Sequence, residues 1–106
     1  LKALVDATLE RFGAIDIVVN NAGVAMPNSL FEVDDMFESQ WATTLDINLT
    51  AHARLVRYAL PSLMQSDSAR IVNIASTNSF RPQHDQPAYT ASKHAVLGLT
   101  RSAAFD

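Results

Sequence analysis

A tyrosine and a lysine four positions apart, Tyr89 and Lys93, are the residues best suited to move a proton. If Pro87 opens a helix, residues four positions apart lie about 40° from one another around its axis, so both side chains share one face. A neighbouring ammonium group favours the ionised form of a phenol, which helps that phenol act as a general acid or base near neutral pH. The same spacing also occurs on ordinary solvated helix faces, so the pair needs support from other residues.

A serine is predicted at the carboxyl end of a buried strand. Ser76 directly follows the apolar run of residues 71–75, whose β-branched residues are typical of a strand. Open α/β sheets bind their ligands at the carboxyl ends of the strands. The Ser76 hydroxyl is therefore predicted to lie at a ligand site.

Two segments that contain asparagine complete the pattern. The segment Asn20–Gly23, read Asn-Asn-Ala-Gly, follows an apolar run, and Asn48 lies within the segment Leu-Asp-Ile-Asn-Leu. Together with Ser76, Tyr89 and Lys93, these segments resemble the short-chain dehydrogenase/reductase family in their order and spacing. The resemblance extends over the whole chain.

The resemblance implies a role for each of these residues. It implies a catalytic tetrad formed by Asn48, Ser76, Tyr89 and Lys93. It also implies that an NAD or NADP cofactor is contacted by Asn20, Asn21, Ala22, Gly23, Tyr89 and Lys93. In the family, the main-chain carbonyl of the matching Asn48 holds a water molecule of the proton relay, and the matching Lys93 binds the nicotinamide ribose. The residues alone also allow a structural interpretation. Asn48 could be a buried side chain that bonds a neighbouring strand, and Asn20–Gly23 could be a turn whose side chains bond strand ends.

The implied activity is hydride transfer with NAD(P)(H) that interconverts a small alcohol and a ketone or aldehyde. In the reductive direction, Tyr89 would protonate the carbonyl oxygen and Ser76 would hydrogen-bond it. Two alternatives stay open: a non-catalytic dinucleotide-binding sensor or scaffold of the same fold, and an epimerase or dehydratase that uses a Tyr-Lys pair on nucleotide sugars. The presence of the whole tetrad argues against the sensor, and the segment Asn20–Gly23 favours the reductase.

Helices and buried strands alternate along the chain, which is typical of an α/β fold. Apolar residues repeat at helical spacing up to Phe12, and Gly13 suits the left-handed position after a helix. Residues 15–19 and 71–75 are predicted to be parallel strands that are covered on both faces. The remaining predicted elements are a loop and a short helix at 26–40, a long helix at 41–64, a loop at 78–86 and a helix at 87–106. With the resemblance, these elements predict part of a Rossmann-like, doubly wound parallel sheet.

Residues 1–106 are predicted to be an internal fragment of one NAD(P)-binding domain. The three glycines of the chain form no Gly-rich turn that could cradle a pyrophosphate, and two strands are fewer than a stable sheet usually needs. Against the family pattern, the amino-terminal strands with the phosphate loop and the carboxyl-terminal strands of the substrate pocket are missing. The isolated fragment is therefore predicted to be inactive and to bind a nicotinamide cofactor weakly or not at all.

Composition and charge exclude several classes of protein. The net charge is −3 without a basic run, which argues against nucleic acid or an anionic membrane as a partner. No apolar stretch approaches the roughly 20 residues of a membrane span, so a cytoplasmic protein is expected. The chain has no cysteine, and its acidic residues near Phe31 lack an ordered ligand spacing, so we expect neither thiol chemistry nor a metal site.

Three features concern the loop before the last helix and the partners of the chain. Family members often carry a glycine three positions after the catalytic serine, where this chain has Ser79, which makes the loop conformation less predictable. His84 and Asp85 could suggest a catalytic dyad, but adjacent residues in a proline-flanked loop seldom align, so contact with solvent or substrate is favoured. The last helix carries a stripe of small residues that permits close approach of another helix. By resemblance, a homodimer or homotetramer is expected through helices 41–64 and 87–106.

Overall fold

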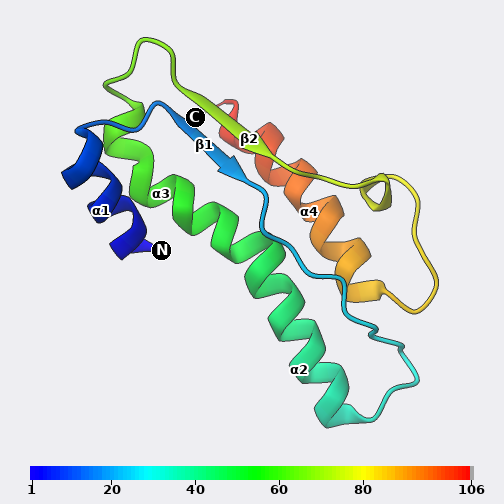
Figure 1. The fold of residues 1–106 in the computed structure, drawn as a ribbon. Coiled ribbons are helices and arrows are strands. Elements are labelled where there is room, and N and C mark those ends of the chain that lie inside the picture. The colour runs from blue at the N-terminus through cyan, green and yellow to red at the C-terminus, as the bar shows by residue number, and fades with distance from the viewer. Residues whose placement is uncertain (106) are drawn as a thin grey trace. The chain divides into compact units, whose positions relative to one another are not determined.

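A computed structural model describes residues 1–105 of the chain (Figure 1). These residues form two compact units. The first unit comprises Leu1–Asn21 and Ala51–Ile74. The second comprises Ala22–Thr50 and the described residues from Ala75 onward. Each unit therefore joins two segments that are distant in the sequence.

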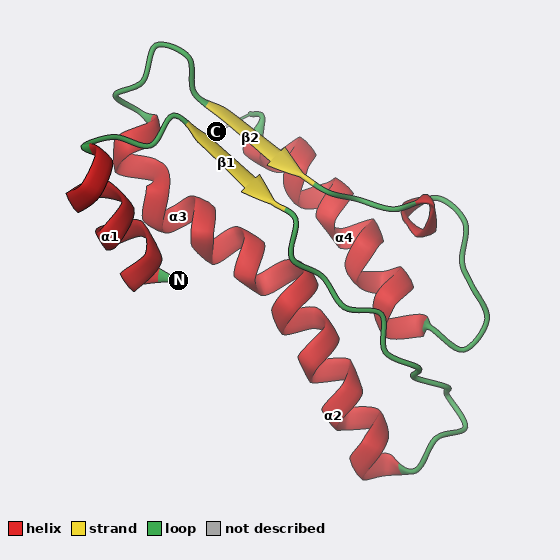
Figure 2. Ribbon diagram, viewed as in Figure 1, coloured by secondary structure: helices red, strands yellow, loops and turns green. Residues whose placement is uncertain are grey.

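The first unit contains a two-stranded parallel sheet, drawn in yellow in Figure 2. Strand β1 (Ile17–Asn20) pairs with strand β2 (Arg70–Asn73), and Asn20 lies opposite Asn73. Both predicted strands are present, with ends that differ from the prediction by one or two residues. The register brings the carboxyl ends of the two strands to the same edge of the sheet.

Helix α3 (Ala51–Leu63) packs on one face of this sheet. Val18 of β1 is buried against Ala59 and Leu63 of α3, and partly buried apolar side chains surround these three. The helix ends two residues after Pro61, which has no N–H to donate to the preceding turn. The core of the first unit thus depends on a few aliphatic side chains.

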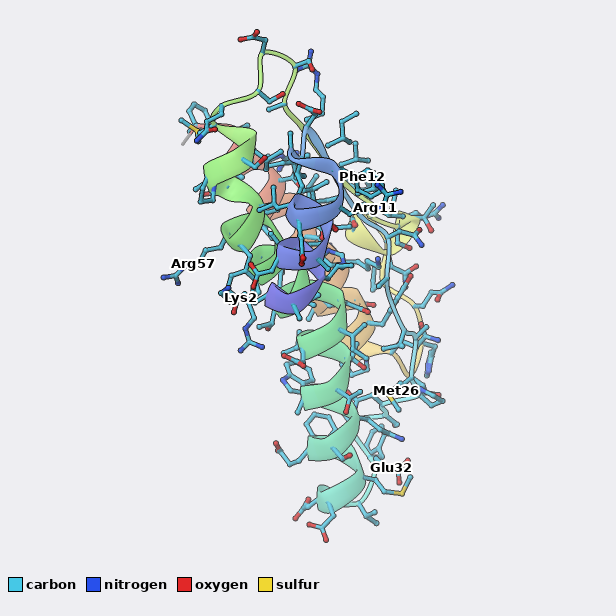
Figure 3. The ribbon with its side chains drawn as sticks, turned by 60° about the vertical axis from the view of Figure 1, so that its left-hand side comes forward. Lys2, Arg11, Phe12, Met26, Glu32 and Arg57 are labelled. Atoms are coloured by element: carbon cyan, nitrogen blue, oxygen red, sulfur yellow. The ribbon has the colours of Figure 1, made fainter. Side chains whose placement is uncertain are left out.

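Helix α1 (Lys2–Phe12) contacts α3 and ends where its sequence predicts. Gly13 adopts a φ of 82°, and its N–H donates to the main-chain oxygen of Leu9 over 2.8 Å. Lys2 and Phe12, which lie at opposite ends of α1 (Figure 3), both have exposed side chains. Val5 is the buried residue of this helix.

The prediction that both strands are covered on both faces is wrong for the described chain. Val18 and Asn20 are buried, whereas Ile17 is 58% exposed and Val19 is 53% exposed. Successive side chains of a strand point to opposite faces, and within the first unit α3 covers the face of Val18. The apolar run indicates that both faces suit burial, but it does not tell which segment covers each one.

The second unit contains helix α2 (Asp34–Leu45), a π-helical turn η1 (Asp46–Thr50), a 3-10 turn η2 (Thr77–Ser79) and helix α4 (Pro87–Ala103). Helix α4 contacts the other three of these elements. It is therefore the element around which the second unit is organised.

Helical residues run without interruption from α2 through η1 into α3. The predicted short helix before residue 40 and the predicted long helix after it are therefore one helical run. Asp34 and Asp35 lie in its first turn, where the helix dipole favours negative charge. The run changes from α to π geometry around Asn48.

Helix α4 begins at Pro87, as predicted, because the fixed φ and missing N–H of proline suit the first helical position. It ends at Ala103, and the last residue of the predicted helix, Asp106, lies outside the described residues. With 17 residues, α4 is longer than α1, α2 or α3 taken singly. No helix within residues 1–105 combines the length and apolar character needed to cross a membrane.

Candidate active site

Tyr89 and Lys93 lie on one face of α4, as their spacing predicts. The Nζ atom of Lys93 is 5.7 Å from the centroid of the Tyr89 ring. Lys93 is only 4% exposed, whereas Tyr89 is partly exposed. The ammonium group is therefore shielded from water beside a phenol that solvent can still reach, which suits proton transfer at the phenol.

Ser76 lies three residues beyond the end of β2 and caps the turn η2. Its Oγ accepts the N–H of Asn78 over 3.1 Å, and its own N–H donates to Ser79 Oγ over 3.3 Å. The two bonds form a reciprocal capping box, which fixes the serine at the start of the turn. A hydroxyl that accepts one bond still has its proton to donate, so Ser76 can donate to a ligand.

Asn48 is fully buried in the π-helical turn η1, and its side chain makes three hydrogen bonds. Its Oδ1 accepts the N–H of Val24, and its Nδ2 donates to the main-chain oxygen of Val24, both over 2.8 Å. The Nδ2 also donates to Ser92 Oγ over 3.1 Å. The Asn48 side chain thus holds the segment that directly follows Gly23, and it is not available to a substrate.

Two serines connect these residues to α4. Ser92 Oγ, which accepts from Asn48, donates to the main-chain oxygen of Tyr89 over 2.8 Å. Ser79 Oγ, which accepts from Ser76, donates to the main-chain oxygen of Lys93 over 2.7 Å. All four predicted tetrad residues are therefore joined through α4 within the second unit.

The motifs in the sequence give neither serine a role. A serine three positions after Tyr89 is placed to bond the carbonyl of that residue within a helix, which is a signal that could have identified Ser92. Ser79 stands three positions after Ser76, the spacing of a capping residue and its partner. The bond from Ser79 to α4 joins two separate elements, and no spacing in the local sequence predicts it.

The predicted cofactor segment begins in a strand and not in a loop. Asn20 is the last residue of β1 and is 3% exposed. Its Nδ2 donates to Asn73 Oδ1 over 2.7 Å and to the main-chain oxygen of His52 over 3.4 Å. This amide therefore ties the ends of β1 and β2, as the interpretation based on strand ends predicts. Asn21, Ala22 and Gly23 are exposed, and their contact with a cofactor stays a prediction.

A cavity of about 510 Å³ opens in the second unit on another side of α4. Its lining from α4 consists of Pro87, Thr90 and Ala91, and does not include Tyr89 or Lys93. The remaining lining residues belong to two loops and are Ser29, Leu30, Phe31, Pro82, Gln83, His84 and Asp85. The cavity is therefore separate from the face of α4 that carries the predicted chemistry.

His84 and Asp85 contact one another at the rim of this cavity. Their side chains are 3.3 Å apart at Nδ1 and Oδ1, and they are 99% and 62% exposed. Water competes for both groups at such exposure, so this contact contributes little to the stability of the loop. Within residues 1–105, no three His, Asp or Glu side chains gather in a way that could bind a metal ion.

Comparison with known proteins gives the same family as the motifs. A family model described as short chain dehydrogenase matches residues 1–106. A short chain dehydrogenase from Penicillium rubens is 36% identical over 104 residues, which cover 98% of this chain and 40% of that protein. A D-beta-hydroxybutyrate dehydrogenase from Cupriavidus necator is 37% identical over 95 residues, which cover 90% of this chain and 36% of that protein.

Solved dehydrogenase structures are similar to this chain over nearly its whole length. The ligand-free aldohexose dehydrogenase of Thermoplasma acidophilum gives a TM-score of 0.91 at 33% identity, covering 99% of this chain and 40% of that one. The acetoin dehydrogenase of Salmonella typhimurium gives a TM-score of 0.87 at 28% identity, covering 98% and 40%. The chain thus spans about 40% of the length of these proteins.

These similarities also test the predicted fold class. The described residues combine helices with parallel strands, and the similar solved structures are dehydrogenases. The prediction of an α/β chain that forms part of a Rossmann-like parallel sheet is confirmed. Since one family model matches every residue of the chain, the chain belongs to the short chain dehydrogenase family.

Proposed function

We propose that the protein containing this chain is an NAD(P)-dependent oxidoreductase that interconverts an alcohol and a ketone or aldehyde, with Tyr89 as the general acid and base. The observation that carries the proposal is the position of Lys93 Nζ, 5.7 Å from the centroid of the Tyr89 ring on one face of α4. Membership of the family and the dehydrogenase relatives support this class of reaction.

The side chains of this chain suit a nicotinamide cofactor. An ammonium group offers three hydrogen-bond donors, so the buried Lys93 is suited to hold the hydroxyl groups of a ribose. The exposed segment Asn21–Gly23 follows the carboxyl end of a parallel strand, where such folds bind dinucleotides. When bound, the cofactor gives or accepts the hydride, while the protein orients the reactants and handles the proton.

Tyr89 moves that proton. In the reductive direction, the phenol donates its proton to the carbonyl oxygen of the substrate as negative charge develops there, and in the oxidative direction the phenolate removes it from the alcohol. The ammonium group of Lys93 lies beside this phenol on α4. Ser76 donates a hydrogen bond to the same substrate oxygen and stabilises the developing charge.

Asn48 contributes through its main chain. Both N–H groups of its buried side chain donate to Val24 and Ser92, so we assign the relay water to the main-chain carbonyl of Asn48. A π-helical turn interrupts the regular α-helical hydrogen bonds and is often found at functional sites, which supports this assignment. Water at this position would return a proton toward Tyr89 after each turnover.

The test is turnover by the full-length protein, followed at the absorbance band of reduced nicotinamide with a panel of ketones and alcohols. Tyr89→Phe removes only the phenol oxygen, and we expect a fall in kcat of about a thousandfold, since general acid–base groups contribute about 10²–10⁴. Cofactor binding, measured by fluorescence titration, should persist in this variant.

The chain offers a matched control, because its second tyrosine, Tyr58, lies exposed on α3. Tyr58→Phe should leave kcat unchanged. Equal activity of Tyr89→Phe and wild-type protein would exclude Tyr89 as the acid. Bound cofactor without turnover of any substrate by the wild-type protein would favour the sensor or scaffold alternative.

A further inference from the structure

A single hydroxyl group lies between the turn that carries Ser76 and the helix that carries Lys93. Ser79 is 2% exposed and takes part in two hydrogen bonds through its Oγ. It accepts the N–H of Ser76 over 3.3 Å and donates its own proton to the main-chain oxygen of Lys93 over 2.7 Å. The result is a continuous path from Ser76 N–H through Ser79 O–H to the Lys93 carbonyl.

The roles of donor and acceptor along this path are consistent. A serine hydroxyl has one proton to donate and two lone pairs to accept with, so both bonds can exist together. The Lys93 carbonyl lies inside α4 and has a second lone pair beyond the one used by the helix. The bond from Ser79 is therefore an addition to the helix and replaces none of its own hydrogen bonds.

Backbone geometry does not explain why a serine stands at this position. Asp85 is the one residue other than glycine with a positive φ among residues 1–105, so position 79 has an ordinary φ. A glycine, which the resemblance to the family would favour here, would supply neither of the two hydrogen bonds. At position 79 this chain therefore differs from the family pattern in the hydrogen bonds of a side chain and not in the conformation of the backbone.

We propose that Ser79 is a positioning residue, whose hydroxyl sets the distance between the Ser76 turn and the α4 turn that carries Lys93. The inference rests on the proposed function, in which Ser76 Oγ and the Tyr89 phenol act on one substrate oxygen. Ser76 is fixed by η2, Tyr89 and Lys93 are fixed by α4, and Ser79 joins these two elements. Loss of the hydroxyl would let the turn move relative to the helix and misalign the two donors.

The first measurement tests the bridge without any substrate or cofactor. In the full-length protein, Ser79→Ala removes the acceptor of the Ser76 N–H, so exchange of that amide with deuterium, followed by NMR, should be about tenfold faster. Thr100→Val is the matched control, because Thr100 Oγ1 also donates to a main-chain oxygen of α4, that of Val96, over 2.7 Å. The control should not change the exchange rate at Ser76.

The second measurement tests the effect on catalysis. We expect kcat to fall about tenfold in Ser79→Ala while KM stays within about twofold, because misplaced groups cost rate more than substrate binding. Ser79→Thr retains the hydroxyl and should recover most of the lost kcat. Thr100→Val should keep wild-type kcat. Urea unfolding of each variant gives its folded fraction under assay conditions. Each rate is divided by this fraction, so that only folded protein is compared.

Each outcome has a defined meaning. Unchanged exchange at Ser76 in Ser79→Ala overturns the bridge. Unchanged kcat in Ser79→Ala, with Tyr89→Phe inactive, overturns the positioning role and leaves the proposed function intact. A loss of activity that only follows the folded fraction also overturns the positioning role. Absence of turnover by the wild-type protein overturns the proposed function and, with it, the catalytic part of this inference.

Discussion

At the scale of single residues, the buried side chain of Asn48 has partners for both ends of its amide group. Its oxygen accepts from Val24 and its nitrogen donates to Val24 and Ser92. An amide can provide both kinds of group, whereas a carboxylate can only accept. The chemical identity of this side chain, beyond its size, is therefore required.

Asn48→Asp tests this requirement with almost no change of shape. The carboxylate would face the main-chain oxygen of Val24 and lose two donated bonds while remaining buried, so we expect the free energy of unfolding to fall by about 3 kcal/mol. Urea unfolding of the full-length protein measures the change. The same exchange of an amide for an acid at exposed Gln65, Gln65→Glu, should change stability by less than about 0.5 kcal/mol. Equal effects of the two substitutions would show that the hydrogen-bond partners of the Asn48 side chain do not require an amide.

At the scale of elements, the end of α1 depends on backbone conformation alone. Gly13 has a φ of 82°, and a Cβ built on it would have no neighbour within 4 Å. Gly13→Ala should therefore lower the free energy of unfolding by about 1 kcal/mol through the left-handed conformation itself, without a steric clash. Gly13→Asn should cost less, because asparagine tolerates this conformation. Urea unfolding measures the stability of both variants. A Gly13→Ala variant as stable as Gly13→Asn, or more stable, would contradict this explanation.

Local signals in the sequence predict the elements of this chain well. The periodicity of α1, the glycine at its end and the proline at the start of α4 act within a few residues, and the structure has all three as predicted. The helical run from α2 into α3 is predicted less well, because the sequence suggests two separate helices where the structure has one continuous run. Its apolar pattern is interrupted by polar residues around Asn48, which a tertiary contact with Val24 accommodates in a π-helical turn.

The candidate site shows the same division between local and tertiary signals. Helix geometry alone predicts that Tyr89 and Lys93 share a face, and they do. The bond from Ser79 to the Lys93 carbonyl and the bond from Asn48 to Ser92 depend on how elements pack, and no spacing rule reveals such partners. Sequence patterns therefore predict that Tyr89 and Lys93 lie together better than they predict the hydroxyl groups that join different elements.

At the scale of the whole molecule, the two-stranded sheet has one apolar face that the described residues leave exposed. The apolar residues that remain at least two-fifths exposed in or directly after these strands are Ile17, Val19, Val72 and Ile74. Exposed β-branched residues side by side on two paired strands form the kind of surface that proteins normally cover. The chain also spans only about 40% of the length of its relatives. We therefore expect other segments of the full-length protein to cover this face.

Val18 and Val19 provide a test of that expectation, because they are neighbours in β1 with side chains on opposite faces. Val18 is 6% exposed and Val19 is 53% exposed. Val18→Ser should destabilise the full-length protein by about 2 kcal/mol through lost apolar burial. If the second face is covered, Val19→Ser should cost a similar amount, and chemical denaturation measures both. A change below about 0.5 kcal/mol for Val19→Ser, as expected for a surface position, would show that this face stays exposed to solvent in the full-length protein.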